Sequence, residues 1–139
     1  MRRSCRWGLC TAVASLLMLA ATAVAVAAAT GAYHGKTSQK QTVTLTLTPT
    51  TVSKLKILVL DKCSAHHTLK SLEKFPPMRA TNGKFGGKFV PTGGHRGESA
   101  TLRGTVGRTR VSGSIRDVSY SKQVHRLCRG SATFSAKHR

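Results

Sequence analysis

The sequence predicts an all-β fold: a six- or seven-stranded antiparallel sandwich or small open barrel with one disulfide, preceded by an N-terminal signal helix. Three observations support this. Several short segments alternate apolar and polar residues with a period of two, which is typical of strands with one buried face. The chain beyond its first thirty residues shows almost no helical pattern. Two cysteines occupy inward positions of two such segments, in a chain that begins with an export signal.

Residues 1–29 have the organisation of a secretory signal peptide. Arg2, Arg3 and Arg6 precede a segment, Trp7 to Tyr33, that contains no Asp, Glu, Lys or Arg. Small residues such as those of Ala27-Ala28-Ala29 follow at the spacing that a signal peptidase accepts. The alternative is an uncleaved signal anchor, because about 20 apolar residues can span a bilayer. Both interpretations place the rest of the chain outside the membrane, since the arginines stay inside.

The remaining chain is long enough for one domain with a single modest core. Residues 30–41 are polar, with Gly, Ser and Lys, and are expected to form a flexible lead-in. The β-domain then covers residues 42–139. Its first strand is "TVTLTLT", residues 42–48, in which Val43, Leu45 and Leu47 share one face.

A second strand is expected over Val52 to Cys63, where the apolar side chains and Cys63 share one parity. Residues 64–77 are expected to form a loop with at most one helical turn, because Pro76 and Pro77 stop a helix. Asn82-Gly83 is a strong tight-turn signal, followed by one strand or a bulged pair of short strands.

The stretch "LRGTVGRTRVSGSIRDV" nearly mirrors itself about its centre. It predicts a hairpin with strands at about 99–106 and 111–118, whose apolar positions and glycines face the same side. Gly104 and Gly113 recur at matching places, and glycine inside a strand often marks the close approach of another segment. The last strand is "RLCRGSATFSA", with Cys128 on its inward face.

Cys63 and Cys128 are therefore expected to form one disulfide. The bridge would close a loop of about 65 residues, for which the chain-entropy treatment gives on the order of 4 kcal/mol of stability.

Taken together, the strand pair ending in Cys63, the "NGKF" segment, the mirrored hairpin and the final C-x-G-x-x-x-F-x-A pattern resemble a group of small exported bacterial proteins. In this chain the final pattern consists of Cys128, Gly130, Phe134 and Ala136. These proteins are commonest in actinobacteria and are mostly described as hypothetical secreted proteins. The resemblance covers about residues 43–136 and implies an exported β-domain with one disulfide. It implies no activity, because the shared residues are structural.

The balance of charge is extreme. The chain contains 23 Lys and Arg; without Arg2, Arg3 and Arg6, 20 remain against four acids, which gives a net charge of +16. Such a field attracts polyanions without a specific site. We therefore expect a secreted, non-enzymatic binding or structural protein whose partners are an anionic cell-wall polymer, an acidic polysaccharide or another polyanion. Contact with a membrane is expected only through an uncleaved signal anchor.

Four arginines of the hairpin are the candidate anion-binding residues: Arg103, Arg108, Arg110 and Arg116. Three alternate with the apolar positions and Arg108 lies at the turn, so they would share one exposed face. Arginine binds phosphate and carboxylate groups bidentately. The alternative is that these residues only solvate the outer face of the sheet. A specific nucleic-acid site is not expected, because stacking platforms of aromatic residues are few.

Catalytic and metal sites are not indicated. The four acids, Asp61, Glu73, Glu98 and Asp117, are spread over the chain and are expected to be solvated and paired with nearby arginines, although Glu98 and Asp117 could approach across the hairpin. His66-His67 is the only histidine cluster and lacks acidic or histidine ligands at suitable spacing. No cofactor is expected. The alternative function is a secreted enzyme or enzyme inhibitor whose site lies in the loops.

Overall fold

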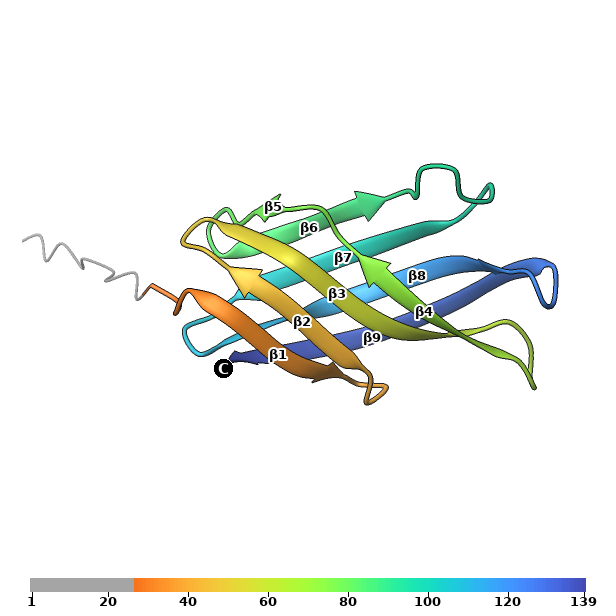
Figure 1. Ribbon diagram of the computed structural model, residues 1–139, viewed down its shortest axis with the longest axis horizontal. Helices are drawn as coiled ribbons and strands as arrows, with labels where there is room; N and C mark the ends of the chain where they lie inside the picture. The colour runs from red at the N-terminus through yellow and green to blue at the C-terminus, as the bar shows by residue number, and fades with distance from the viewer. Residues whose placement is uncertain (1–26) are drawn as a thin grey trace, which may run out of the picture.

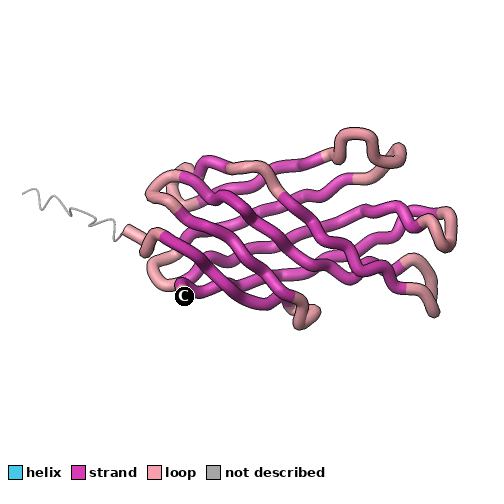
Figure 2. The backbone as a smooth tube through the Cα atoms, viewed as in Figure 1, coloured by secondary structure: helices cyan, strands magenta, loops and turns pink. Residues whose placement is uncertain are grey.

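The computed structural model describes residues 27–139, which form a small β-barrel without any helix in that range (Figure 2). The nine strands are β1 (Gly31–Thr37), β2 (Thr42–Leu47), β3 (Thr51–Lys62), β4 (Thr68–Lys74), β5 (Met78–Arg79), β6 (Lys84–Phe89), β7 (Ser99–Val106), β8 (Arg110–Ser121) and β9 (Arg126–His138). The predicted signal helix lies outside the described residues. Within residues 27–139 no helix could cross a membrane.

The strands form one antiparallel sheet in the order β4-β3-β2-β1-β9-β8-β7-β6 (Figure 1). The long strand β3 closes this sheet into a barrel. Its first residues pair with β5, as Val52 faces Met78, and its last residue, Lys62, pairs with Arg129 of β9. Strands β4 and β6, at the two ends of the order, each pair with only one long strand and keep a free edge.

One glutamine completes the closure between β3 and β9. Gln39 lies in the turn between β1 and β2, and its side-chain amide accepts a hydrogen bond from the backbone of Leu60 (2.8 Å). It also donates to the carbonyls of Leu60 (3.0 Å) and Ser131 (3.3 Å). Beyond the end of the β1–β2 hairpin, the Gln39 side chain thus makes the hydrogen bonds to β3 and β9 that a neighbouring strand would otherwise make.

The apolar core fills the part of the barrel nearer the β2–β3 and β7–β8 turns. Its fully buried large side chains come from β1, β2, β3, β7 and β8: Tyr33, Val43, Val52, Leu55, Ile57, Val59, Leu102, Val111 and Ile115. Gly104 and Gly113 face each other across the β7–β8 ladder. A Cβ atom at either would collide with the ring of Phe85 or Phe134, so the mirrored glycines make room for two core aromatic side chains.

Much of the predicted architecture is confirmed. The β7–β8 hairpin has the expected register, with Leu102 opposite Ile115. Asn82 and Gly83 both have positive φ (51° and 71°) and form the tight turn before β6. Cys63 and Cys128 form the disulfide. The barrel alternative, rather than a sandwich, describes the fold.

Two predictions for single segments are wrong, which brings the described strands to nine instead of six or seven. Residues 31–37, predicted as part of a flexible lead-in, form β1, which pairs with β2 on one side and β9 on the other. Residues 68–74, predicted as a loop, form β4, which pairs with β3 along its whole length. In both strands tertiary pairing overrides weak local propensity.

The two ends of the barrel differ. The loops that follow β3, β6 and β8 gather at the end opposite the β2–β3, β5–β6 and β7–β8 turns (Figure 1). Towards these loops the inward positions of the strands turn polar. On β3 the inward residue after Val59 is Asp61, and on β8 the inward residues after Ile115 are Asp117 and Ser121, all three buried. The barrel therefore has an apolar half and a polar half.

Candidate functional site: a cationic surface and an acidic groove

The outer surface carries almost all of the positive charge. The 20 Lys and Arg side chains in residues 27–139 are all exposed. No acid in that range is: Asp61 and Asp117 are buried, and Glu73 and Glu98 are partly buried. Because the exposed charges in that range are all positive, the outer surface of the molecule is predominantly cationic.

The four candidate arginines lie on the outer side of the β7–β8 hairpin, in two groups. Arg103 faces Ser114, and Arg116 is two residues further along β8, so these two are diagonal neighbours with a separation of about 7–8 Å. Arg110 is directly opposite Lys137 of β9. It lies about 14 Å along the strand from the Arg103 row, at 3.4 Å per residue. Arg108 lies in the turn beside this second group.

Hydroxyl side chains fill the outer face between the two groups. Ser112 and Ser114 on β8 are paired with Ser135 and Thr133 on β9. All four lie at outward positions and are exposed or partly exposed. The result is a strip with cations at both ends and hydroxyl groups in the middle.

The four acids converge in the polar half of the barrel. Asp61 projects inward from β3, where burial raises its pKa, and the charge of Asp117 on β8 reaches it and raises the pKa further. The charge of Asp117 also reaches Glu73, and so does that of Glu98. The expectation of four dispersed, solvated acids paired with arginines is therefore wrong. Glu98 and Asp117 both line one groove.

Gly130 is the reason that the Asp61 carboxyl fits between two strands. Gly130 pairs with Asp117 on β8. A Cβ atom at residue 130 would overlap an Asp61 carboxyl oxygen and lie 2.8 Å from the Leu60 carbonyl. Only glycine leaves this space, so the Gly of the "C-x-G" pattern serves the buried acid.

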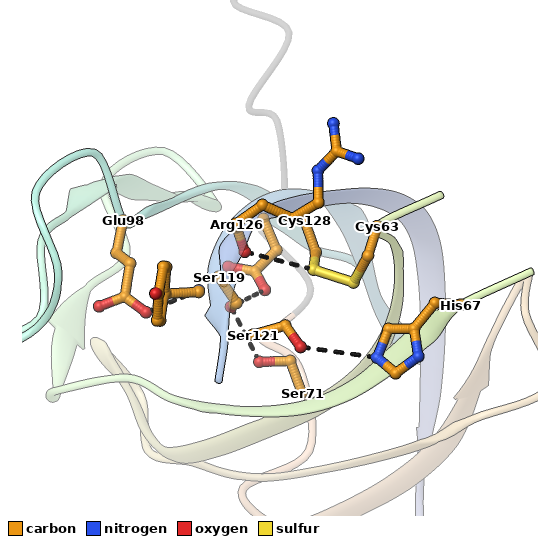
Figure 3. Close-up of a disulfide and its surroundings, with 10 residues drawn as sticks. Cys63, His67, Ser71, Glu98, Ser119, Ser121, Arg126 and Cys128 are labelled. Carbon is orange, nitrogen blue, oxygen red and sulfur yellow. Dashed lines mark hydrogen bonds between the residues drawn. A yellow bond between two sulfur atoms is a disulfide. The ribbon is translucent and has the colours of Figure 1, made fainter. Parts of the chain in front are cut away.

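Serine hydroxyls connect the carboxyl groups. Ser119 donates to Asp117 (2.7 Å), and Ser71 on β4 donates to Glu73 (2.7 Å). The hydroxyl oxygens of Ser71 and Ser119 are also 3.0 Å apart (Figure 3). Each hydroxyl has one proton, so when both donate to carboxylates no proton is left for the contact between them. The cluster is therefore rich in acceptors and poor in donors.

Asp61 has the least satisfied carboxyl. Its side chain is fully buried, and neither oxygen accepts a hydrogen bond from a donor of the protein. Burial raises its pKa to about 8, and the charges of Asp117 and Glu73 raise it further. Burial also raises the pKa of Glu73. A carboxyl group that is buried near other acids holds its proton more tightly, because burial and like charges both disfavour its ionised form.

Glu98 is held differently, by backbone amides. Its two oxygens accept hydrogen bonds from the amides of His95 (2.6 Å) and Tyr120 (2.8 Å). The His95 and Tyr120 rings stack on each other with centroids 3.6 Å apart. Glu98 therefore fixes the loop between β6 and β7 against the end of β8.

These acids face an open groove of about 730 Å³ between β4 and the β6–β7 loop. Asp117, Ser119, Ser71 and Glu73 belong to its lining, while Asp61 lies behind Asp117. The apolar part of the lining includes Phe75, Pro76, Phe89, Val90 and Pro91. Phe75 and Phe89 pack edge to face, and Val90, 68% exposed, is one of two strongly exposed large apolar residues in the described range. The groove thus has an acidic floor and an apolar wall.

The disulfide and a histidine bound the far side of the polar half (Figure 3). The bridge ties the end of β3 to β9, and Cys128 is paired with Ser119 in the ladder. His67 is partly buried, with Nε2 3.5 Å from the Ser121 hydroxyl, whereas His66 is exposed. No group of three or more His, Cys, Asp or Glu in residues 27–139 could hold a metal ion.

The alternation of inward and outward positions in the sequence identifies the two buried acids, Asp61 and Asp117. Asp61 has the same parity as Leu55, Ile57, Val59 and Cys63, and Asp117 has the same parity as Val111 and Ile115. A carboxylate at an inward position of a strand is expected to be buried. No such signal marks Glu73, because its strand is not predicted by its sequence.

Comparisons of the chain with protein-family models, with curated proteins and with solved structures find no match. The resemblance to small exported bacterial proteins therefore stays a prediction.

Proposed function

We propose that this protein is an exported, non-enzymatic binding protein whose cationic surface holds anionic polymers of the cell envelope or the extracellular space. The observation that supports this most is the segregation of charge. Every lysine and arginine of the described range is exposed, and every acid is withdrawn into one cluster. Acids dispersed over the surface would neutralise part of it; their collection in one groove leaves the rest of the surface cationic.

The arrangement of the hairpin arginines favours a chain of anionic groups over a single anion. Arg103 and Arg116 form one group, and Arg108 and Arg110 beside Lys137 form another, about 14 Å away along β8. A polymer with repeated phosphate or carboxylate groups could contact both groups, and the hydroxyls between them could bind its backbone. The disulfide agrees with an oxidising location outside the cell.

The test compares two variants of equal charge. The hairpin variant replaces Arg103, Arg108, Arg110 and Arg116 by Gln, and the control variant replaces Lys56, Lys62, Lys122 and Arg126, which are also exposed. Binding to heparin and to long-chain polyphosphate is measured by titration at several salt concentrations. We expect the hairpin variant to bind roughly tenfold more weakly than the control variant, with a shallower dependence of log K on log salt, as the loss of counterion release predicts.

Equal losses in the two variants would show binding through net charge alone and would remove the hairpin as a site. Wild-type binding that does not weaken with salt would contradict the whole proposal, because exposed charges are screened within a Debye length of about 8 Å at physiological ionic strength.

A second candidate function, an enzyme or enzyme inhibitor, is favoured by one observation. The groove brings polar groups together in a concave site, and the Asp61–Asp117 pair resembles the carboxyl pairs that perform acid–base chemistry. A survey of glycoside and peptide hydrolysis that compares wild type with Asp117→Asn tests it. Turnover that disappears in the variant supports an enzyme, and a lack of turnover in the wild type leaves the binding function.

A further inference from the structure

We propose that the groove binds a small organic cation, namely an ammonium group with N–H donors on an apolar body, which places its head among Asp117, Glu73 and the serines. This site is separate from the anion-binding surface of the hairpin and does not depend on it. Three properties of the described residues lead to it: the deficit of donors, the negative charge and the apolar wall.

The donor deficit is the first property. Ser71 and Ser119 use their protons on Glu73 and Asp117, and their oxygens, 3.0 Å apart, still lack a donor. Both oxygens of the buried Asp61 lack one as well. A buried acceptor without a donor costs about 1–3 kcal/mol, so the cluster is stabilised by a group that brings several N–H bonds. A primary ammonium has three donors and no acceptor.

The charge is the second property. The charged groups around the cluster are Asp61 on β3, Glu73 on β4, Asp117 on β8 and Glu98 before β7; Lys70, Lys74 and Lys88 also line the groove. These three lysines are exposed, and the hydrogen-bond partners of Glu73 and Asp117 are serine hydroxyls. A cation that enters the groove can therefore bind carboxyl groups whose hydrogen-bond partners are serine hydroxyls and not lysines.

The shape is the third property. A volume of about 730 Å³ is in the usual range for a small-molecule site. The side chains of Phe75, Phe89 and Val90 offer an apolar surface beside the acidic floor. A long polycation is disfavoured, because the surrounding surface has a net charge of +16 and repels it. A metal ion is disfavoured because the described residues do not place three ligands together. The best match is thus a singly charged alkyl or arylalkyl ammonium.

Binding should be coupled to the release of a proton. The Asp61 carboxyl is buried without a donor and its pKa is raised, so it retains a proton near neutral pH; an ammonium group that brings donors and positive charge to the cluster favours the release of that proton. When one proton is displaced, the affinity increases up to tenfold for each pH unit, and this increase stops once the free site has lost its proton.

The experiment titrates the purified protein with n-hexylammonium by calorimetry at about four pH values between pH 5.5 and 9, and determines one dissociation constant at each pH. Hexan-1-ol has the same apolar body without charge, and tetraethylammonium has the charge without N–H donors. We expect saturable binding of hexylammonium with a millimolar or lower Kd, at least tenfold weaker binding of both analogues, and a heat that depends on the ionisation enthalpy of the buffer.

Two variants with the same change in net charge locate the site. Glu73→Gln removes a carboxylate from the partly buried edge strand β4 and should weaken hexylammonium binding roughly tenfold. Thr50→Lys adds one positive charge in the exposed β2–β3 turn, outside the groove, and should leave the affinity unchanged. Thermal unfolding checks that both variants are folded.

Several results would overturn the proposal. They are the lack of saturable hexylammonium binding up to about 10 mM at pH 8, equal binding of hexan-1-ol, equal binding of tetraethylammonium, or an affinity that Glu73→Gln does not change. None of these results touches the binding of polyanions, which the arginine variants test separately.

Discussion

At the scale of single residues, the most unusual group is the Asp61 carboxyl. It is fully buried without a protein donor, and Gly130 leaves the space that its oxygen occupies. Burial and the neighbouring Asp117 raise its pKa to about 8, whereas an unfolded aspartate titrates near 3.9. Between these values the folded protein holds a proton that the unfolded chain does not.

This difference fixes the sign of the pH dependence of stability. Since the folded state binds more protons between about pH 4 and 8, the free energy of unfolding decreases as the pH rises through this window. The slope is at most about 1.4 kcal/mol for each pH unit and levels off above the folded pKa. Urea unfolding of wild type and Asp61→Asn at unit steps from pH 4 to 9 measures it. We expect the variant to lose most of the slope and to be the more stable protein at pH 8.

A wild-type stability that is constant or increases from pH 5 to 8 would contradict a proton retained by Asp61 in the folded state. Equal slopes in wild type and Asp61→Asn would assign the pH dependence to another group.

At the scale of elements, the closure between β3 and β9 depends on the turn that joins β1 and β2. Gln39 makes three hydrogen bonds to the backbone of the two strands, where only one backbone pair, Lys62 and Arg129, joins them directly. Gln41 is a matched control in the same turn, because its side chain bonds only to the Gln39 carbonyl.

We expect Gln39→Ala to lower the free energy of unfolding by about 1–3 kcal/mol, since it leaves the partly buried backbone N–H and carbonyl of Leu60 on β3 without these partners. Gln41→Ala should cost less than about 0.5 kcal/mol. Chemical unfolding of the two variants provides the comparison. Equal costs would show that the barrel closes without the glutamine.

The same elements show how far the sequence predicts the fold. Strands β2, β3, β7, β8 and β9 follow from strict alternation, and the disulfide follows from the parity of its cysteines. Strand β4 could not be predicted, because its inward positions hold Leu69, Ser71 and Glu73, only one of which is apolar. That mixed face is possible only because it looks into the groove and not into the core. The groove could therefore not be predicted from the sequence, because the polar residues of β4 that line it do not give the alternating pattern of a strand.

At the scale of the whole molecule, charge is the dominant constraint. The net charge of residues 27–139 is +16, and their 20 cations lie on the surface of a barrel of only 113 described residues (139 minus 26). Self-repulsion of this size destabilises the compact state, because the unfolded chain separates the charges. The disulfide offsets it by about 4 kcal/mol in the chain-entropy treatment.

This balance predicts that salt stabilises the protein. The Debye length decreases from about 30 Å at 0.01 M to about 8 Å at 0.15 M, so salt screens the repulsion between cations that lie on different strands. The midpoint of thermal unfolding should rise over this range, by about 4–8 °C for each kcal/mol of repulsion removed. Calorimetric scans at constant pH measure it.

The hairpin variant without Arg103, Arg108, Arg110 and Arg116 provides the matched comparison. With four fewer positive charges it should unfold at a higher temperature than wild type in low salt and should gain less from added salt. A wild-type midpoint that falls as salt is added would mean that attractive pairs outweigh repulsion, which contradicts a surface without exposed acids. A midpoint that rises equally in both proteins would assign the effect to the solvent and not to the arginines. The expected outcome would connect function and stability. A polyanion bound to the four arginines would reduce the repulsion between them and would therefore stabilise the folded protein.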